Sequence, residues 1–433
     1  MKKLLAIILV LCMIFSLAAC GGNGDNGDVQ NGGDTTQSTQ GGSQDGTGEG
    51  SQGGSQGGSA STGAGSLGER TLNKSGAVSS VDKLANTYYK LTTEKKLNVA
   101  YFGGSVTGGT GGEGGYCWAS ETTKWLKSNF PNAQINELNN AWGGTSAFWG
   151  YFRMDTDTSG SKGNLVKFNP DLIFIEFSIN DAYAHLTKMQ SSYYMEGIVK
   201  KLRAANPNVD IVIVFVTDKS RQGTEHDNIL GHKAVAEHYG IPTINVGDAL
   251  VAEIKAKNAK WEDYVIDIVH PNNKGYEVYS KCIANYLKGA LVTSPDKSGY
   301  KAHAKPANDL CTNALQGSQI IPAHEVTTHN GLKLISGNSV NCPDFGGKNL
   351  FGKSGNTITI EFEGRGIGFL SAGGAGSRII VKVGETVKVV NLTGGDNNFE
   401  YVGIENLPYG KYTAEFEIDL GTKVAFGGFL IEK

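Results

Sequence analysis

Between about residues 81 and 292, short continuous apolar runs alternate with longer amphipathic stretches. Apolar runs of about four to eight residues are typical of strands buried on both faces of a sheet, and longer amphipathic stretches are typical of helices. The pattern predicts strands at 97–102, 134–138, 172–177, 209–216 and 242–246. It predicts helices at 81–91, 117–128, 192–204, 228–239, 249–257 and 274–288. This alternation predicts a parallel α/β sheet covered by helices on both faces.

The pattern changes after residue 292. Residues 293–310 are rich in turn formers and show no periodicity, which is typical of a linker. Residues 311–433 contain runs in which apolar and polar positions alternate, separated by glycine turns. The clearest runs are Ile358–Phe362, Ile379–Val383, Val387–Val389, Tyr412–Ile418 and Phe429–Ile431. Alternation with period two predicts an antiparallel β-sandwich as a second domain, after a first domain at 69–292.

The N-terminus has the pattern of an export signal over residues 1–20. Two lysines precede an apolar stretch, Leu4–Leu17, which is short for a membrane span. The stretch ends in Leu-Ala-Ala-Cys, which resembles the bacterial lipobox. That resemblance implies cleavage before Cys20 and lipidation of Cys20. We therefore expect an exported protein, anchored by lipid to the outer face of the bacterial cytoplasmic membrane or cell envelope.

The composition predicts a disordered tether and gives no indication of nucleic-acid binding. Much of the glycine, 61 residues in all, lies in the Gly/Ser/Gln-rich segment 21–68, which has too few apolar side chains to fold and is expected to be disordered. The net charge of −3 provides no basic face for nucleic acid. With 433 residues, of which 39% are hydrophobic, the chain can bury two cores.

Four cysteines remain beyond the signal, at positions 117, 282, 311 and 342. They allow three pairings, among them Cys117 with Cys282 and Cys311 with Cys342, and four free thiols are an equally open alternative. No two of them are closely spaced, and the histidines do not supply convincing ligand spacing. The sequence therefore predicts no metal site.

A small polar side chain follows the first predicted strand. The apolar run 97–102 stops at Gly103 and Gly104, and Ser105 comes next. Open parallel sheets bind their ligands at the carboxyl ends of the strands, so Ser105 is a candidate nucleophile at that rim.

The same region also allows a different interpretation. Gly109, Gly111 and Gly114 fit the spacing G-x-G-x-x-G, and Glu137 lies near the end of the next strand, as in dinucleotide-binding folds. These glycines begin well past the strand end, however, and an exported protein has little access to nicotinamide cofactors. We therefore predict no cofactor.

Further polar residues follow the other strands. A glycine turn containing Gly144 follows the second strand, Asn180 follows the third, and Asp267 and His270 precede the last helix. Hydrolysis by a serine needs a base, a carboxylate that orients the base, and donors for the oxyanion. Each of these requirements has a candidate here, and we expect Asp181 to brace the turn beside Asn180 rather than to act chemically.

These blocks resemble the four sequence blocks of the SGNH, or GDSL-type, serine hydrolases over roughly residues 92–290. The matching residues are Gly103-Gly104-Ser105, Gly144, Asn180 within Ser-Ile-Asn-Asp, and Asp267-x-x-His270. Two positions depart from the family pattern, because Gly104 replaces the usual aspartate of Gly-Asp-Ser and Ser178 replaces the usual glycine of Gly-x-Asn-Asp.

The resemblance implies a flavodoxin-like three-layer α/β/α fold and a role for each residue. Ser105 would be the nucleophile, His270 the general base and Asp267 its partner. The backbone N–H groups of Ser105 and Gly144, with the side-chain amide of Asn180, would form the oxyanion hole.

Two features indicate a carbohydrate substrate. Trp142 lies inside the glycine turn, where its ring would stack on a sugar or wall the acyl pocket. Residues 311–433, especially LPYGKYTAEFEI, resemble the jelly-roll accessory domains of carbohydrate-active enzymes, although the domain contains no tryptophan. A purely structural domain and a binding module are both open for it.

Together these features predict an exported, lipid-anchored serine esterase that removes acetyl or another short acyl group from a polysaccharide. Two alternatives remain: a non-catalytic glycan-binding lipoprotein that keeps the fold, and a lipase or acyltransferase of the same superfamily.

Overall fold

The structure is a computed structural model that describes residues 70–79, 83–156, 163–222, 224–292, 297–336, 348–374, 376–393 and 400–433. The chain divides into the units 1–60 and 61–433, and all described residues belong to the second. The predicted export signal, Cys20, the tether 21–68 and Cys342 lie outside the described residues, so the expectations about them remain predictions.

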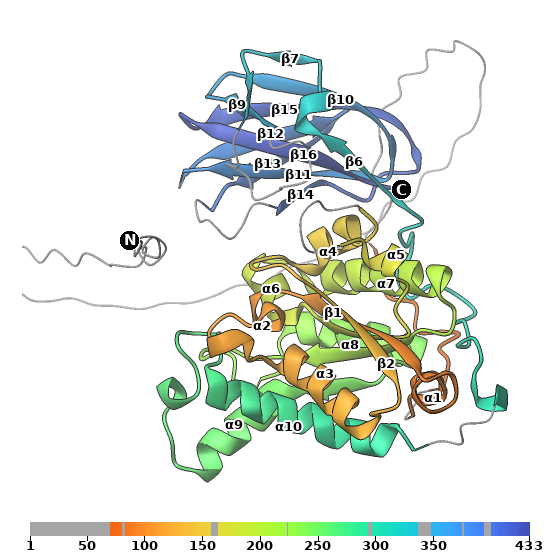
Figure 1. The fold of residues 1–433 in the computed structure, drawn as a ribbon. Coiled ribbons are helices and arrows are strands. Elements are labelled where there is room, and N and C mark those ends of the chain that lie inside the picture. The colour runs from red at the N-terminus through yellow and green to blue at the C-terminus, as the bar shows by residue number, and fades with distance from the viewer. Residues whose placement is uncertain are drawn as a thin grey trace, which may run out of the picture. The chain divides into compact units, whose positions relative to one another are not determined.

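The first part of the described chain contains a five-stranded parallel sheet with the order β2-β1-β3-β4-β5 (Figure 1). Its strands are β1 (Lys96–Gly103), β2 (Gln134–Ala141), β3 (Leu172–Glu176), β4 (Asp210–Phe215) and β5 (Thr243–Asn245). Every residue of β3 and β4 is buried, because helices cover both faces, which is why these strands are continuous apolar runs in the sequence. The predicted α/β fold class is confirmed, and the strand order is the flavodoxin-like one.

Alternate residues of each strand face two separate cores. One core contains side chains of α4, α7 and α8, and the other contains side chains of α3, α9 and α10 (Figure 1). The helices of this part are α1 (Ala85–Tyr89), α2 (Ser105–Gly108), α3 (Trp118–Asn129), α4 (Ala147–Arg153), α5 (Leu165–Phe168), α6 (Ser178–Tyr183), α7 (Lys188–Ala205), α8 (Asp227–Tyr239), α9 (Val246–Ala256) and α10 (Asn273–Ala290). The six helices predicted from the sequence are present, whereas α2, α4, α5 and α6 were not predicted as separate helices because they are short.

Two helices start four residues away from their predicted positions. The helix predicted at 192–204 starts at Lys188, because Thr187 and Gln190 form a reciprocal capping box at its N-terminus. The helix predicted at 81–91 is α-helical only over Ala85–Tyr89 and continues as a π-helical turn, Lys90–Glu94.

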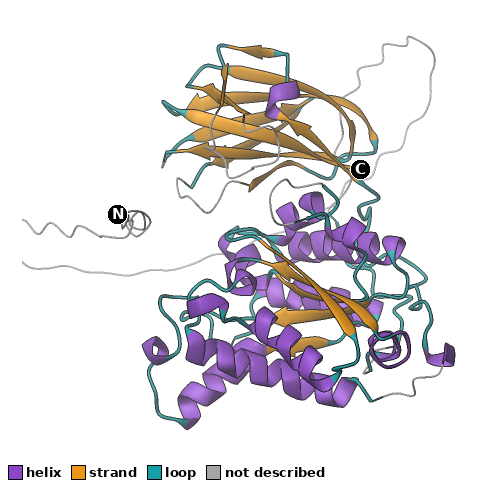
Figure 2. Cartoon of the chain, in the orientation of Figure 1, coloured by secondary structure: helices purple, strands orange, loops and turns teal. Residues whose placement is uncertain are grey.

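The second part consists of two antiparallel sheets around their own apolar core (Figure 2). One sheet has the order β13 (Thr386–Asn391), β12 (Arg378–Val383), β15 (Gly410–Leu420), β10 (Thr357–Gly364) and β7 (His329–Asn330). The other has the order β14 (Glu400–Ile404), β11 (Gly366–Gly373), β16 (Val424–Glu432), β9 (Lys348–Gly352) and β8 (Lys333–Ser336), and β6 (Ser318–Pro322) also pairs with β16.

The predicted β-sandwich is confirmed, but only β10, β12, β13, β15 and part of β16 correspond to predicted runs, and β6, β7, β8, β9, β11 and β14 were missed. In β11, six successive residues are buried, which hides the alternation that marks a half-buried strand, and all of β16 is buried as well. One reason is contact with the α/β part, where Phe148 packs on Gly368 so closely that a Cβ there would overlap the ring.

Contacts between the two parts include a buried ionic cluster. Arg70 lies 3.1 Å from Glu405 and 3.2 Å from Glu432, and Tyr194 on α7 donates a 2.7 Å hydrogen bond to Glu432. Burial of these charges is compensated by their mutual pairing and by the tyrosine hydroxyl.

The segment that joins the two parts packs on the α/β part. His303 Nε2 lies 3.0 Å from Asp210 Oδ1, and the N–H groups of Leu310 and Cys311 donate to Glu196 at 2.6 and 2.8 Å. The side chains of Leu310, Cys311 and Leu315 belong to a core of the α/β part. The boundaries 69–292, 293–310 and 311–433 therefore remain predictions, with residues on both sides of position 311 sharing one core.

Cys117, Cys282 and Cys311 are free thiols. Of the alternatives left open by the sequence, the Cys117–Cys282 pairing is absent. Within the described parts of the chain, no helix combines the length and the apolar character that crossing a membrane requires.

Candidate active site

Ser105 lies at the carboxyl end of β1, as the sequence predicted, and is the first residue of α2. The two glycines before it are required by close packing. A Cβ at Gly103 would overlap the backbone oxygen of Glu176, and a Cβ at Gly104 would overlap the carboxamide of Asn180. Gly104 has an ordinary φ of −92°, so steric contact explains this glycine.

Ser105, His270 and Asp267 form one chain of hydrogen bonds. Ser105 Oγ lies 2.7 Å from His270 Nε2, and His270 Nδ1 lies 2.7 Å from Asp267 Oδ2. The second oxygen of Asp267 accepts the backbone N–H groups of Val269 and His270, both at 2.8 Å. The serine–base and base–carboxylate contacts both fall within the range of a hydrolase triad.

The loop that carries Asp267 and His270 is held in a closed turn. Val265 and Pro271 form an isolated antiparallel bridge, and the Ile266 N–H donates to the His270 oxygen at 2.9 Å. Partial burial acts to raise the pKa of Asp267, but the hydrogen bonds from His270 and Val269 outweigh it and lower this pKa below its ordinary value. The carboxylate is therefore ionised at neutral pH and is able to stabilise a protonated His270.

The segments that carry the three predicted oxyanion groups lie next to one another. A Cβ at Gly143 would lie 3.5 Å from Ser105 Cβ, so the glycine turn passes next to the serine. Gly144 has a φ of +74°, a conformation that favours glycine, and its N–H makes no hydrogen bond to another described residue. The side chain of Asn180 lies against Gly104. The sequence blocks are thus brought together in space.

Asp181 has a structural position, as expected from the sequence. One carboxylate oxygen accepts the Ala147 N–H at the start of α4 at 2.7 Å, and the other lies 2.9 Å from His232 Nε2. Both side chains of this pair are fully buried. The pair fixes α6, and hence Asn180, to α4 and α8.

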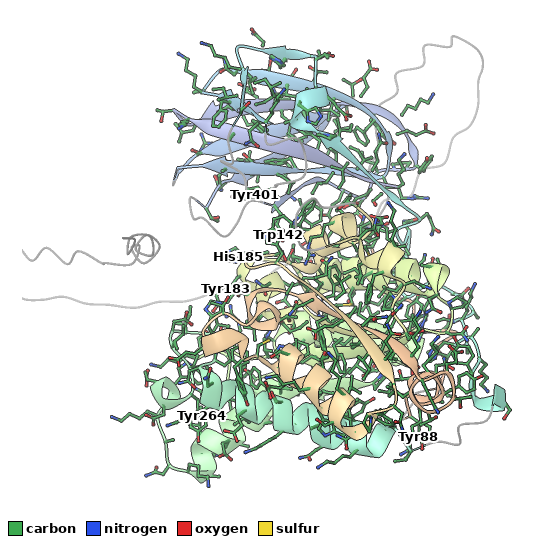
Figure 3. All side chains as sticks on the ribbon, viewed as in Figure 1. Tyr88, Trp142, Tyr183, His185, Tyr264 and Tyr401 are labelled. Atoms are coloured by element: carbon green, nitrogen blue, oxygen red, sulfur yellow. The ribbon has the colours of Figure 1, made fainter. Side chains whose placement is uncertain are left out.

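Trp142 follows β2 directly, and its backbone N–H donates to the Gly103 oxygen at 2.9 Å (Figure 3). Only 9% of the residue is exposed. Most of the residue is therefore buried, and the role of Trp142 in sugar stacking remains a prediction.

Two buried charged residues near the site were not assigned a function from the sequence. Arg153 on α4 donates to the Asn140 oxygen at 3.0 Å and to the Gly103 oxygen at 3.3 Å, and it also pairs with the Asn140 side chain. Burial lowers the pKa of Arg153 to about 9. Glu176, the last residue of β3, accepts a 2.9 Å hydrogen bond from Thr107. No local motif marks either residue, because their partners lie in distant segments of the chain.

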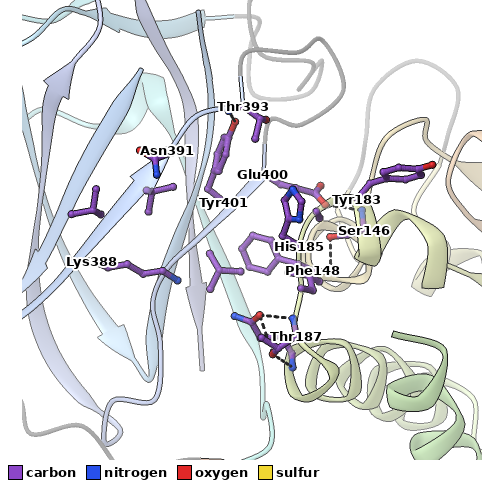
Figure 4. A pocket seen from close by; sticks show the side chains of 16 residues that line it. Ser146, Phe148, Tyr183, His185, Thr187, Lys388, Asn391, Thr393, Glu400 and Tyr401 are labelled. Atoms are coloured by element: carbon purple, nitrogen blue, oxygen red, sulfur yellow. Dashed lines mark hydrogen bonds between the residues drawn. The ribbon is translucent and has the colours of Figure 1, made fainter. Parts of the chain in front are cut away.

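A cavity of about 510 Å³ lies between α6, α7 and the strands β13 and β14 (Figure 4). Its polar lining residues are Ser146, Tyr183, His185, Thr187, Gln190, Lys388, Asn391, Thr393, Glu400 and Tyr401. The buried Glu400 accepts the Ser146 N–H at 2.6 Å, and its other oxygen has no partner among the described residues. Burial raises the pKa of Glu400 to about 8.

Among the described residues, no three His, Cys, Asp or Glu side chains are grouped as metal ligands would be.

Comparison with known proteins identifies a family and a fold. Residues 101–278 match the GDSL-like Lipase/Acylhydrolase family. No curated protein sequence matches the chain. A crystal structure described as a two-domain esterase active on acetylated mannans is similar to 84% of this chain and 99% of its own, with 18% identity and a TM-score of 0.67. A second crystal structure has the same description, with the esterase co-crystallized with mannopentaose. It is similar to 84% of this chain and 98% of its own, with 18% identity and a TM-score of 0.66. At this identity the likeness shows the fold, an α/β part followed by a β-sandwich.

Proposed function

Because residues 101–278 belong to the GDSL-like lipase/acylhydrolase family, a family of carboxylic ester hydrolases, we propose that this protein removes short acyl groups, above all acetyl, from a polysaccharide. The observation that carries the proposal is the hydrogen-bonded chain from Ser105 through His270 to Asp267. The proposal assigns these three residues to catalysis.

In the proposed reaction, Ser105 Oγ attacks the ester carbonyl carbon while His270 Nε2 takes the hydroxyl proton. Asp267 holds the imidazole ring by its Nδ1–H and stabilises the imidazolium that forms. The proposal assigns the N–H groups of Ser105 and Gly144 and the amide of Asn180 to binding of the negative oxygen of the tetrahedral intermediate.

The intermediate then collapses. His270 returns the proton to the leaving sugar oxygen, which departs as a hydroxyl group and leaves an acyl group on Ser105. Water attacks this acyl-enzyme, with His270 again as the base, and the free acid is released. The proposed reaction balances in atoms and protons with the side chains named above and one water molecule.

The surroundings of the triad favour a short acyl group. Residues 107–115 and 271–275, on either side of it, are polar and rich in glycine. Ile266 and Ile268 flank Asp267 and are 59% and 57% exposed, which provides an open apolar surface rather than an enclosed tunnel. A longer acyl chain would leave methylene groups in water, and each of them would lack the roughly 0.8 kcal/mol of stabilisation that burial provides. We therefore expect the site to bind longer acyl chains no more tightly than acetyl.

A polysaccharide carrier is supported by two observations. The likeness to esterases active on acetylated mannans extends over both parts of the chain. The polar cavity of Figure 4 includes Ser146, two residues after Gly144, and Tyr183, three residues after Asn180. We propose that a glycan chain binds in this cavity, with the β-sandwich supplying Lys388, Asn391 and Tyr401.

The test measures hydrolysis of p-nitrophenyl acetate and octanoate, and acetate release from a panel of acetylated polysaccharides. We expect a higher kcat/KM for the acetate ester and release from at least one polysaccharide. Ser105→Ala and His270→Ala should each remove most of the activity without loss of folding, and the double variant should be little worse than either, because the residues act as a unit.

Two outcomes would contradict the proposal. Substantial hydrolysis by folded Ser105→Ala protein would exclude the proposed nucleophile, and faster turnover of octanoate would favour a lipase-like function. Binding of glycans without any ester hydrolysis by the unaltered protein would favour a non-catalytic role.

We also propose lipid anchoring through Cys20. The support is the Leu-Ala-Ala-Cys sequence after a short apolar stretch, followed by a glycine-rich tether. Expression in a bacterium with radiolabelled fatty acid should label the unaltered protein and leave Cys20→Ala protein unlabelled, and equal labelling of both would contradict the anchor.

A further inference from the structure

A buried glutamate lies directly behind the nucleophile. Glu176 is fully buried at the end of β3 and pairs with Gly103 in the ladder between β1 and β3. Its Oε2 accepts the Thr107 hydroxyl at 2.9 Å. Thr107 lies two positions after Ser105, and Gly103, the ladder partner of Glu176, lies two positions before it, so Glu176 contacts the chain on both sides of the nucleophile.

Glu176 is incompletely satisfied. Its Oε1 has no hydrogen-bond partner among the described residues. A buried carboxylate with one oxygen that accepts no hydrogen bond destabilises the folded protein, whereas a carboxylic acid in the same place carries no net charge. The geometry alone therefore favours the protonated form.

Charged and titratable groups lie near Glu176 on several elements. Asp181 on α6 carries like charge and opposes ionisation of Glu176. Tyr276 and Tyr279 on α10 are buried, and the Tyr276 hydroxyl donates to the Val106 and Thr110 oxygens. The guanidinium of Arg153 binds the oxygen of Gly103, the residue that pairs with Glu176. Burial is the largest influence and, with Asp181, outweighs the hydrogen bonds from Thr107 and Gly104, so that the pKa of Glu176 is raised to about 8.

We propose that Glu176 is a positioning residue whose uncharged carboxyl group sets the turn Gly104–Thr107 and thereby aims Ser105 Oγ and the Ser105 N–H. The inference rests on the proposed function and adds a residue that acts through others. A negative charge on Glu176 would oppose the negative charge that develops on the substrate oxygen, because the carboxyl group is buried behind the turn that carries Ser105 and is not screened by water there. The site therefore works best while Glu176 holds its proton.

A pH dependence follows from this arrangement. As the pH rises through about 8, Glu176 ionises, and kcat should fall while KM changes little. Stability should change in the same range, since the raised pKa means that the folded state binds a proton more tightly than the unfolded state. The contribution is present at low pH and is lost as the pH rises from the ordinary glutamate pKa toward about 8.

The first test uses Glu176→Gln in the full chain, with p-nitrophenyl acetate as the probe. Glutamine keeps the acceptor oxygen and cannot ionise, so the variant should retain activity at pH 7 and lose the fall in kcat near pH 8. Glu176→Ala removes the acceptor and should lower kcat on the order of 10- to 100-fold at unchanged KM. An alkaline fall that is the same in Glu176→Gln as in the unaltered protein would overturn the inference.

Thr107→Val provides a second variant that keeps shape and removes the donor. It should lower kcat by several-fold at unchanged KM, and an unchanged kcat would contradict the positioning role. Glu196→Gln is the matched control, because Glu196 is an equally buried glutamate that binds Leu310, Cys311 and Tyr239 on the far side of α7. It should alter stability and leave the alkaline fall of kcat in place.

Thermal unfolding gives a readout that does not depend on activity. From pH 5 to pH 9 the midpoint of the unaltered protein should fall relative to that of Glu176→Gln, and parallel curves would contradict the protonated state of Glu176. If the unaltered protein hydrolyses no ester, the proposed function fails, and the unfolding curves still decide the charge state of Glu176.

Discussion

The carboxamide of Asn180 lies so close to Gly104 that a Cβ at position 104 would overlap Asn180 Oδ1. This contact joins the residue before Ser105 to a proposed oxyanion donor that lies 76 positions later in the sequence. It also explains why glycine stands where the related hydrolases usually have aspartate, because in this chain a side chain at position 104 would displace Asn180.

Replacing Gly104 by alanine should therefore damage the proposed oxyanion hole. We expect Gly104→Ala to lower kcat on p-nitrophenyl acetate on the order of 10- to 100-fold, since a shift of about 1 Å in a catalytic group has this effect. Gly289→Ala on α10 is the matched control, because open space surrounds that position and alanine favours a helix. A fully active Gly104→Ala protein would show that Asn180 tolerates displacement.

Removal of the Asn180 amide tests the donor itself. Asn180→Ala should reduce kcat by a factor on the order of 10² to 10³ with little change in KM, because the amide would contact the oxygen mainly when it is charged. Asn228→Ala, which removes a buried amide bound to Leu186 and Ser191, should reduce stability and leave kcat nearly unchanged. A change in KM alone for Asn180→Ala would make Asn180 a substrate-binding residue.

Trp142 can be tested by comparing two substrates. If its ring contacts sugar, Trp142→Ala should impair acetate release from polysaccharide more than hydrolysis of p-nitrophenyl acetate. Thermal unfolding must accompany the assay, because removal of a mostly buried tryptophan costs about 3 to 5 kcal/mol of stability. Equal losses on both substrates by folded protein would assign Trp142 to packing.

Glu400 should make the stability of the protein depend on pH. Burial raises its pKa to about 8, above the unfolded value, so its proton stabilises the folded state and this contribution is lost as the pH rises toward 8. We expect Glu400→Gln to flatten the fall of the unfolding midpoint between pH 5 and pH 9, as measured by circular dichroism. A slope equal to that of the unaltered protein would mean that Glu400 is ionised throughout.

The sequence predicted the α/β sheet well because its strands are buried on both faces and are separated by helices long enough to show their own period. It also predicted residues after three strands, and Asp267 and His270 before the last helix, and the structure brings these segments together around Ser105. These residues could be found because each belongs to a short motif, and Ser105 and Asn180 closely follow apolar strands.

Other features depend on partners that are distant in the chain and could not be predicted. Glu176 belongs to an apolar strand, and only the pairing of β1 with β3 places its carboxyl behind Ser105. Glu400 becomes a buried acceptor only where β14 meets α4. The burial of Trp142 results from the packing of the whole rim, which a local glycine turn does not reveal.

The central place of β16 has a consequence for the order of folding during synthesis. The parallel sheet is complete once Asn245 has been made, so its strands can pair early, as domains generally do on the ribosome. In the β-sandwich, β6, β9 and β11 all pair with β16, which follows the three of them in the sequence. We expect one edge of each of these strands to remain unpaired until Val424–Glu432 has been synthesised. The β-sandwich should therefore be more prone to aggregation during synthesis than the parallel sheet.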